Sequence, residues 1–88
     1  VQYLTLKKRN DAYIEYDYRA LLGKVLEVFG TQAAFAKAIG LSERSVSLRF
    51  NNKVEWDQND MVRSAEELAF ENGVNDIPRY FFNLKVQH

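Results

Sequence analysis

Residues 31–53, TQAAFAKAIGLSERSVSLRFNNK, constrain the fold of this chain more than any other stretch, because two short helical patterns stand on either side of a glycine. Thr31 can cap a first helix that ends at Ile39, and the apolar positions of this helix recur at three- and four-residue spacing. Gly40 can take the left-handed conformation that closes a helix without a Cβ penalty. We therefore predict a tight turn at Gly40 between two helices.

The second helix of the pair is expected from Glu43 to about Asn51, with Ser42 as its N-cap. Val46 and Phe50 lie four residues apart, so both can point into a core from one face of this helix. The opposite face carries polar and charged side chains. This face is the part of the helix pair whose side chains can bind a partner.

The residues that stand at characteristic spacings in this pair are Gln32, Ala36, Gly40, Leu41, Ser42 and Val46. With these residues the stretch resembles the helix-turn-helix of Cro-type and phage-repressor-type DNA-binding domains. A longer run, residues 15–56 together with the late IPRYFF, resembles a family of short phage regulators from Gram-positive hosts. The resemblance implies an all-α, lambda-repressor-like compact bundle of four to five helices, with short N- and C-terminal extensions that could form β-structure.

The resemblance also implies DNA contacts, residue by residue. The residues that it places toward base edges are Ser42, Glu43, Arg44, Ser47 and Leu48. Arg44 is the first candidate, since a guanidinium can bond O6 and N7 of guanine together, and Glu43 could accept from N4 of cytosine. The residues that it places toward phosphates are Gln32, Lys37, Arg49, Asn51, Asn52 and Lys53.

Several of these assignments have a plainer alternative. Glu43 can simply be a carboxylate in the first turn of a helix, and Arg44 can pair with a surface acid. Leu48 is apolar where reading residues are often polar, and Arg49 occupies a site that is commonly a buried hydrophobe, for which Phe50 can substitute. Leu48 could contact a thymine methyl group, or it could be the centre of a protein-binding face.

Charge bears on the choice between these partners. The chain has 12 Lys and Arg against 12 Asp and Glu. Residues 1–53 carry nine of the basic and five of the acidic residues, whereas residues 54–88 carry three and seven. A DNA-binding protein usually has a positive excess, so a net charge of zero predicts weak non-specific DNA affinity and leaves room for a protein partner.

Composition argues against other classes of protein. The chain lacks cysteine, and its one histidine is His88, so thiol, nucleophilic and metal chemistry have almost no residues to use. We expect no catalytic residues, no metal and no cofactor. The apolar runs are too short for a membrane span or a secretory signal, which predicts a soluble intracellular protein. Together with this, the resemblance to phage regulators implies a location in the cytoplasm of a bacterial host.

The flanking segments are predicted to support the helix pair as one domain over residues 16–88. Asp17 can cap a helix over residues 18–29, and Gly23 inside this helix predicts the close approach of a neighbouring helix. Asp57 can cap a later helix that runs to about Glu71, with its exit at Asn72-Gly73.

The two ends of the chain are harder to interpret. Residues 1–15 form an extension or arm, and they could begin a β-hairpin whose charged run, residues 7–9, is either a DNA-reaching arm or, as we favour, a solvated turn. The aromatic tail either closes the core or forms a dimer seam, with residues 82–86 alternating as a short strand would. The residues assigned to a partner or dimer interface are Leu48, Tyr80, Phe81, Phe82, Leu84 and Val86.

Two hypotheses about function follow from the sequence. The first is a transcriptional regulator that places the second helix of the pair in the major groove of operator DNA, as a two-fold dimer. The alternative is a modulator or antirepressor that binds a partner repressor protein through Leu48, Arg44 and their neighbours, and so changes the DNA binding of that repressor.

Overall fold

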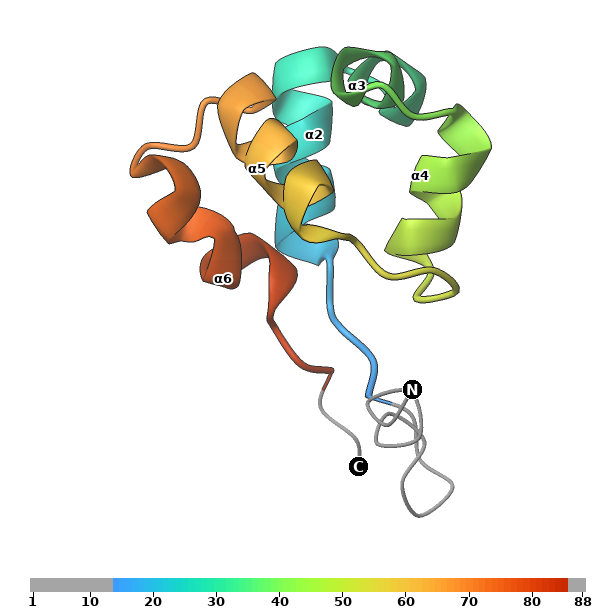
Figure 1. Ribbon diagram of the computed structural model, residues 1–88, viewed down its shortest axis with the longest axis vertical. Coiled ribbons are helices and arrows are strands. Elements are labelled where there is room, and N and C mark those ends of the chain that lie inside the picture. The colour runs from blue at the N-terminus through green and yellow to red at the C-terminus, as the bar shows by residue number, and fades with distance from the viewer. Residues whose placement is uncertain (1–13, 86–88) are drawn as a thin grey trace.

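The computed structural model describes residues 14–85 of the chain, which form helices packed around one core (Figure 1). The helices in this range are α2 (Arg19–Phe29), α3 (Gln32–Ile39), α4 (Glu43–Phe50), α5 (Gln58–Glu67), the short 3₁₀ helix η2 (Gly73–Asp76) and α6 (Ile77–Phe81). The described residues contain no strand, so the predicted all-α bundle is confirmed. No helix in this part of the chain is long and apolar enough to cross a membrane.

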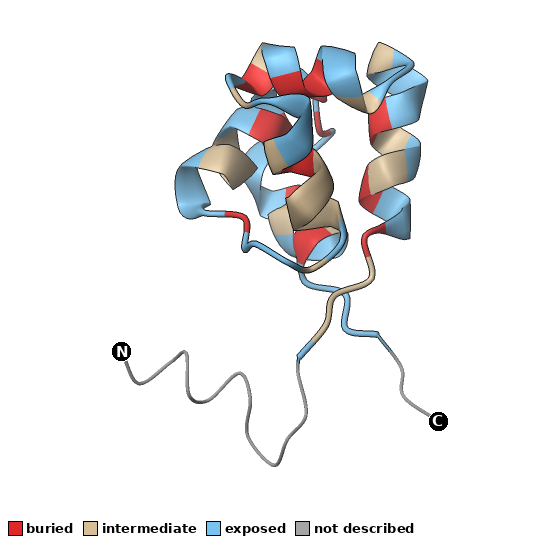
Figure 2. Ribbon diagram, turned by 90° about the vertical axis from the view of Figure 1, so that its right-hand side faces the viewer, coloured by how far each residue is buried: buried red, intermediate tan, exposed pale blue. Residues whose placement is uncertain are grey.

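The core is built largely from aromatic side chains that lie between the helices, and the buried positions face inward (Figure 2). Trp56, from the loop between α4 and α5, stands at its centre. Its ring centroid is 5.2 Å from that of Phe81, 5.4 Å from that of Phe50 and 6.3 Å from that of Tyr18. The buried apolar residues are Tyr18, Leu21, Val25, Phe35, Ala36, Ile39, Val46, Trp56, Ala65, Leu68, Phe70 and Phe81.

The α3–α4 pair has the predicted boundaries at its turn. The hydroxyl of Thr31 accepts from the Ala34 N–H at 3.1 Å, and the hydroxyl of Ser42 accepts from the Ser45 N–H at 3.0 Å. Gly40 has a φ of 80°, in the left-handed region. Side-chain caps at both N-termini and a glycine at the turn therefore fix where α3 ends and α4 begins.

The predicted end of α5 was wrong. The helix ends at Glu67, and not near Glu71, because Ala69 takes a positive φ of 52°. The N–H of Phe70 then bonds back to the Ala65 carbonyl at 3.0 Å, which is the Schellman closure of a helix. This turn places the Phe70 ring against the core, stacked 4.3 Å from the ring of Tyr80. Burial of an aromatic ring here outweighs the strain of a left-handed alanine.

Two expectations for α2 also need correction. The helix begins at Arg19, and Asp17 lies one position too early to be its N-cap, although its carboxylate accepts from the Arg19 N–H at 3.0 Å. Gly23 is exposed, and a Cβ built on it would meet nothing within 4 Å. Close approach of a neighbouring helix therefore does not explain this glycine.

The C-terminal segment is extended but makes only a single β-bridge, from Tyr16 to Leu84, where a short strand was expected. The bridge is antiparallel, with the Asp17 N–H bonded to the Asn83 carbonyl at 2.6 Å and the Lys85 N–H to the Glu15 carbonyl at 2.9 Å. The two ends of the described chain therefore lie together at one end of the molecule (Figure 1). The predicted hairpin, the basic run at residues 7–9 and Val86 lie outside the described residues.

Replacing Gly23 with alanine should stabilise the protein. Alanine removes backbone freedom from the unfolded chain and meets no atom in the folded one, so the free energy of unfolding should rise by about 0.5–1 kcal/mol. Denaturant unfolding followed by the fluorescence of Trp56, the single tryptophan, measures the change. Gly40→Ala is the control, and it should lower stability because alanine is strained at a φ of 80°.

Candidate functional site

The outward face of α4 is the first candidate surface. Ser42, Glu43 and Arg44 are exposed at its N-terminal end, and Ser47 and Leu48 are half-buried along it. The hydroxyl of Ser42 already caps the helix, so its oxygen has a structural partner. Of the residues predicted to face base edges, Glu43 and Arg44 therefore extend furthest into solvent.

Arg49 does not lie on this surface, which corrects its assignment to a phosphate. Its side chain is 13% exposed, and its Nε lies 3.2 Å from the Oδ2 of Asp60 on α5, whose side chain is 12% exposed. The guanidinium also donates to the carbonyl and the hydroxyl of Ser45. Arg49 thus attaches α4 to α5 through a largely buried ion pair, and its Nε and Nη1 groups donate inside the molecule.

Asn52 also has a structural role, and its side chain bonds within the molecule at the position where a phosphate contact was predicted. Its Oδ1 accepts from the Tyr16 N–H at 2.9 Å, and its Nδ2 donates to the Tyr16 carbonyl at 3.0 Å. The residue follows α4 with a φ of 61°, a conformation that asparagine tolerates well. Its position just after a helix was a sequence signal for this backbone conformation. Its partner, 36 residues away, had no such signal.

The other residues assigned to phosphates remain near the surface. Lys37 and Lys53 are exposed, and Gln32 is half-buried at the start of α3. Asn51 is exposed, but its Nδ2 donates to the Ser47 carbonyl at 2.8 Å. Together with Arg44, the two lysines are the basic side chains that this pair of helices turns toward solvent.

A groove of about 630 Å³ lies beside this surface, where the ends of several elements meet. The half-buried side chains of Leu22 and Phe50 supply apolar lining from α2 and α4. The full set of lining residues is Tyr16, Asp17, Tyr18, Arg19, Leu22, Gln32, Phe50, Asn51, Leu84 and Lys85. The groove thus connects the C-terminal end of α4 to the paired ends of the chain.

The predicted interface residues of the tail separate into two groups. Phe81 is 1% exposed and belongs to the core, so its assignment to an interface is corrected, and Tyr80 is half-buried against Phe70. Phe82 and Leu84 are exposed, as is Ile14. Only the second group offers apolar surface to another molecule.

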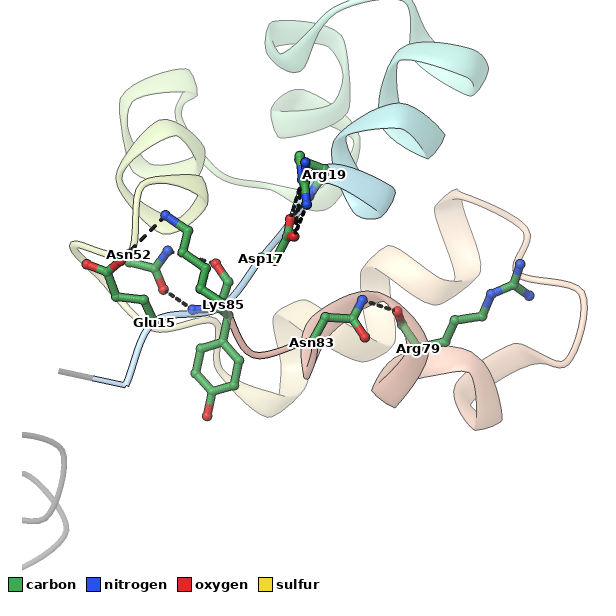
Figure 3. Close-up of polar contacts among 8 residues, drawn as sticks. Glu15, Asp17, Arg19, Asn52, Arg79, Asn83 and Lys85 are labelled. Atoms are coloured by element: carbon green, nitrogen blue, oxygen red, sulfur yellow. Dashed lines mark hydrogen bonds and ion pairs between the residues drawn. The ribbon is translucent and has the colours of Figure 1, made fainter. Parts of the chain in front are cut away.

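A charged contact stands at the entrance to α2, beside the groove. The Asp17 carboxylate receives two hydrogen bonds from the Arg19 Nε and one of 2.6 Å from its Nη2 (Figure 3). These bonds lower the pKa of Asp17 from 3.8 to about 2. At the neighbouring position, burial raises the pKa of the Tyr18 hydroxyl to about 12. Within residues 14–85, no group of His, Cys, Asp or Glu could hold a metal ion.

Comparison with known proteins gives a family match and a similar solved structure. A family model described as a protein of unknown function (DUF739) matches residues 14–84. The solution structure of the modulator of repression (MOR) of the temperate bacteriophage TP901-1 from Lactococcus lactis is 50% identical to this chain, with a TM-score of 0.66. The match covers 82% of this chain and 95% of that one. No curated protein matches.

The Asp17–Arg19 contact should make stability depend on pH in the acid range. Because the pKa of Asp17 is lowered in the folded state, its stabilising contribution is complete above about pH 4 and is lost as the pH falls toward 2. An NMR titration of the Asp17 carboxyl group should give a midpoint near 2. In Arg19→Ala the midpoint should return toward 3.8, and an unchanged midpoint would contradict the assigned cause.

Breaking the Arg49–Asp60 pair should destabilise the protein. Arg49→Met leaves the Asp60 carboxylate largely buried without its cation, so the free energy of unfolding should fall by about 1–3 kcal/mol. Denaturant unfolding of Arg49→Met, Asp60→Asn and the double variant measures the coupling between them. The free energy of unfolding should fall less in the double variant than the sum of its decreases in the two single variants. If the decreases simply add, the two side chains have no coupling energy and the prediction is wrong.

Proposed function

Because this chain belongs to the DUF739 family and is similar over most of its length to a phage modulator of repression, we propose that it binds a partner repressor protein and changes the DNA binding of that repressor. The role is non-enzymatic and is carried out in the cytoplasm of the bacterial host. The main support is the 50% identity to the phage protein, which covers 95% of that chain.

The surface of α4 supports a protein partner over DNA. Two of the residues that a DNA reader would turn toward phosphates, Arg49 and Asn52, are held inside the molecule by Asp60 and Tyr16. The outward face of α4 carries a half-buried Leu48 between polar and charged side chains. An apolar centre within a polar rim is the usual composition of a protein–protein interface.

Direct operator binding is the second candidate. It is supported by the geometry of two helices joined at Gly40 and by three exposed cations, Lys37, Arg44 and Lys53. In this case the N-terminal end of α4 enters the major groove, and Arg44 reads a guanine. The two candidates predict opposite effects of one substitution at Leu48.

Leu48→Arg separates the candidates. A cation at the centre of a protein interface should weaken binding to the repressor by at least about tenfold, whereas added positive charge should preserve or tighten binding to DNA. The measurement is a titration of operator DNA with a phage repressor that recognises it, with and without this protein, and of the same DNA with this protein alone. The salt dependence of any direct binding shows the share of phosphate contacts.

Val74→Arg is the matched control, because it makes the same aliphatic-to-arginine change on η2, which lies at the opposite side of the molecule from α4 (Figure 1). It should leave both activities unchanged. A wild-type protein that leaves repressor binding to the operator unaffected, yet itself binds the operator selectively, would overturn the modulator function in favour of the second candidate.

A further inference from the structure

Asn52 connects the end of α4 to the two ends of the described chain. Its side-chain amide bonds both the N–H and the carbonyl of Tyr16, much as a neighbouring strand would. Tyr16 is bridged on its other side to Leu84, through the bonds from Asp17 to Asn83 and from Lys85 to Glu15. We call residues 15–17 and 83–85 the terminal clasp. Figure 3 shows Asn52 beside Glu15 and Lys85 of this clasp.

The backbone of Asn52 also ends α4. With a φ of 61°, it lets the Lys53 N–H bond back to the Leu48 carbonyl at 2.9 Å, while its own N–H bonds to the Arg49 carbonyl at 3.2 Å. These two bonds close the helix as a Schellman motif. One residue therefore has two roles, since its backbone ends the helix and its side chain holds the clasp.

The ring contacts of the clasp reach α4 through Tyr18, whose ring centroid is 6.1 Å from that of Phe50. Tyr16 contacts Tyr18 and Phe82 through its ring, at centroid distances of 6.1 and 6.0 Å, and neither residue belongs to α4. The Lys85–Glu15 ion pair, at 3.5 Å, lies within the clasp itself. The two bonds of Asn52 are thus the polar link by which order in the clasp reaches the last turn of α4.

We infer that Asn52 is a positioning residue, through which pairing of the two chain ends orders the last turn of α4. The partner-binding part of this inference rests on the proposed function. Leu48 on that turn, with its polar neighbours Ser47 and Asn51, belongs to the face of α4 that we propose binds the repressor. When the clasp opens, the last turn of α4 loosens and the surface loses its fixed shape. Rigid presentation of an interface favours affinity, since less freedom is lost on binding.

Two variants test the link between the clasp and α4, one at Asn52 and one within the clasp. Asn52→Gly keeps the left-handed backbone and removes both bonds to Tyr16. Lys85→Pro removes the N–H that bonds to Glu15 and leaves α4 and Asn52 untouched. Lys85→Ala is the matched control for the second variant, because it removes the same side chain and keeps the N–H. Far-ultraviolet circular dichroism and Trp56 fluorescence establish that each variant is folded.

The first readout is amide hydrogen exchange at Asn52 and Lys53, the two N–H groups that close α4. In Asn52→Gly and in Lys85→Pro, exchange at Lys53 should be about tenfold faster than in the wild type, and the double variant should be no faster than either single one. Lys85→Ala should exchange as the wild type does. Unchanged exchange in a folded Lys85→Pro would overturn the inference, because the clasp would then be independent of α4.

The second readout is the Kd for the repressor, measured with the same variants. Both clasp variants should weaken binding about tenfold, and Lys85→Ala should not. Faster exchange with an unchanged Kd would overturn the positioning role at the partner surface. A wild-type protein that does not bind the repressor would contradict the proposed function instead, and the exchange measurement would still decide whether Asn52 couples the clasp to α4.

Discussion

Burial of Trp56 is the interaction on which the rest of the structure depends. Its ring contacts Tyr18 at the start of α2, Phe35 of α3, Phe50 of α4 and Phe81 of α6, so one loop residue sets the positions of four elements. Each such aromatic pair contributes about 0.5–1.5 kcal/mol beyond the area that it buries. The indole N–H has no hydrogen-bond partner within the described residues.

This core leaves α4 attached at both ends, with one face turned outward between them. At its start, the Gly40 turn and the Ser42 cap fix the direction of the helix. At its end, Arg49 is joined to α5 and Asn52 to the terminal clasp. The surface available to a partner is therefore what these attachments leave outside, namely Glu43 and Arg44 at one end and the half-buried Leu48 with its polar neighbours along the helix.

Sequence reasoning succeeded where the deciding interaction is local. The caps at Thr31, Ser42 and Asp57 act within four residues, and the apolar spacing of α3 and α4 depends only on helical periodicity. It failed where the deciding partner is distant. The early end of α5 depends on a stacked ring from α6, and the inward turn of Arg49 depends on Asp60. No pattern in the sequence predicted that Asn52 and Tyr16 would bond to each other.

The same long-range contacts bear on the proposal that this neutral chain with paired helices binds a protein partner. Binding to DNA gains affinity from cations that neutralise phosphates and from neutral donors that bond to them. The inward Arg49 removes one such cation, and the bonded Asn52 removes one such donor. An interface with a protein does not need those contacts. It gains from apolar area and from rigid presentation, and both Leu48 and the attachment of α4 at its two ends supply these. Under the proposed function, the contacts that remove phosphate-binding groups from the surface of α4 are therefore also the contacts that hold this surface in a fixed shape for a protein partner.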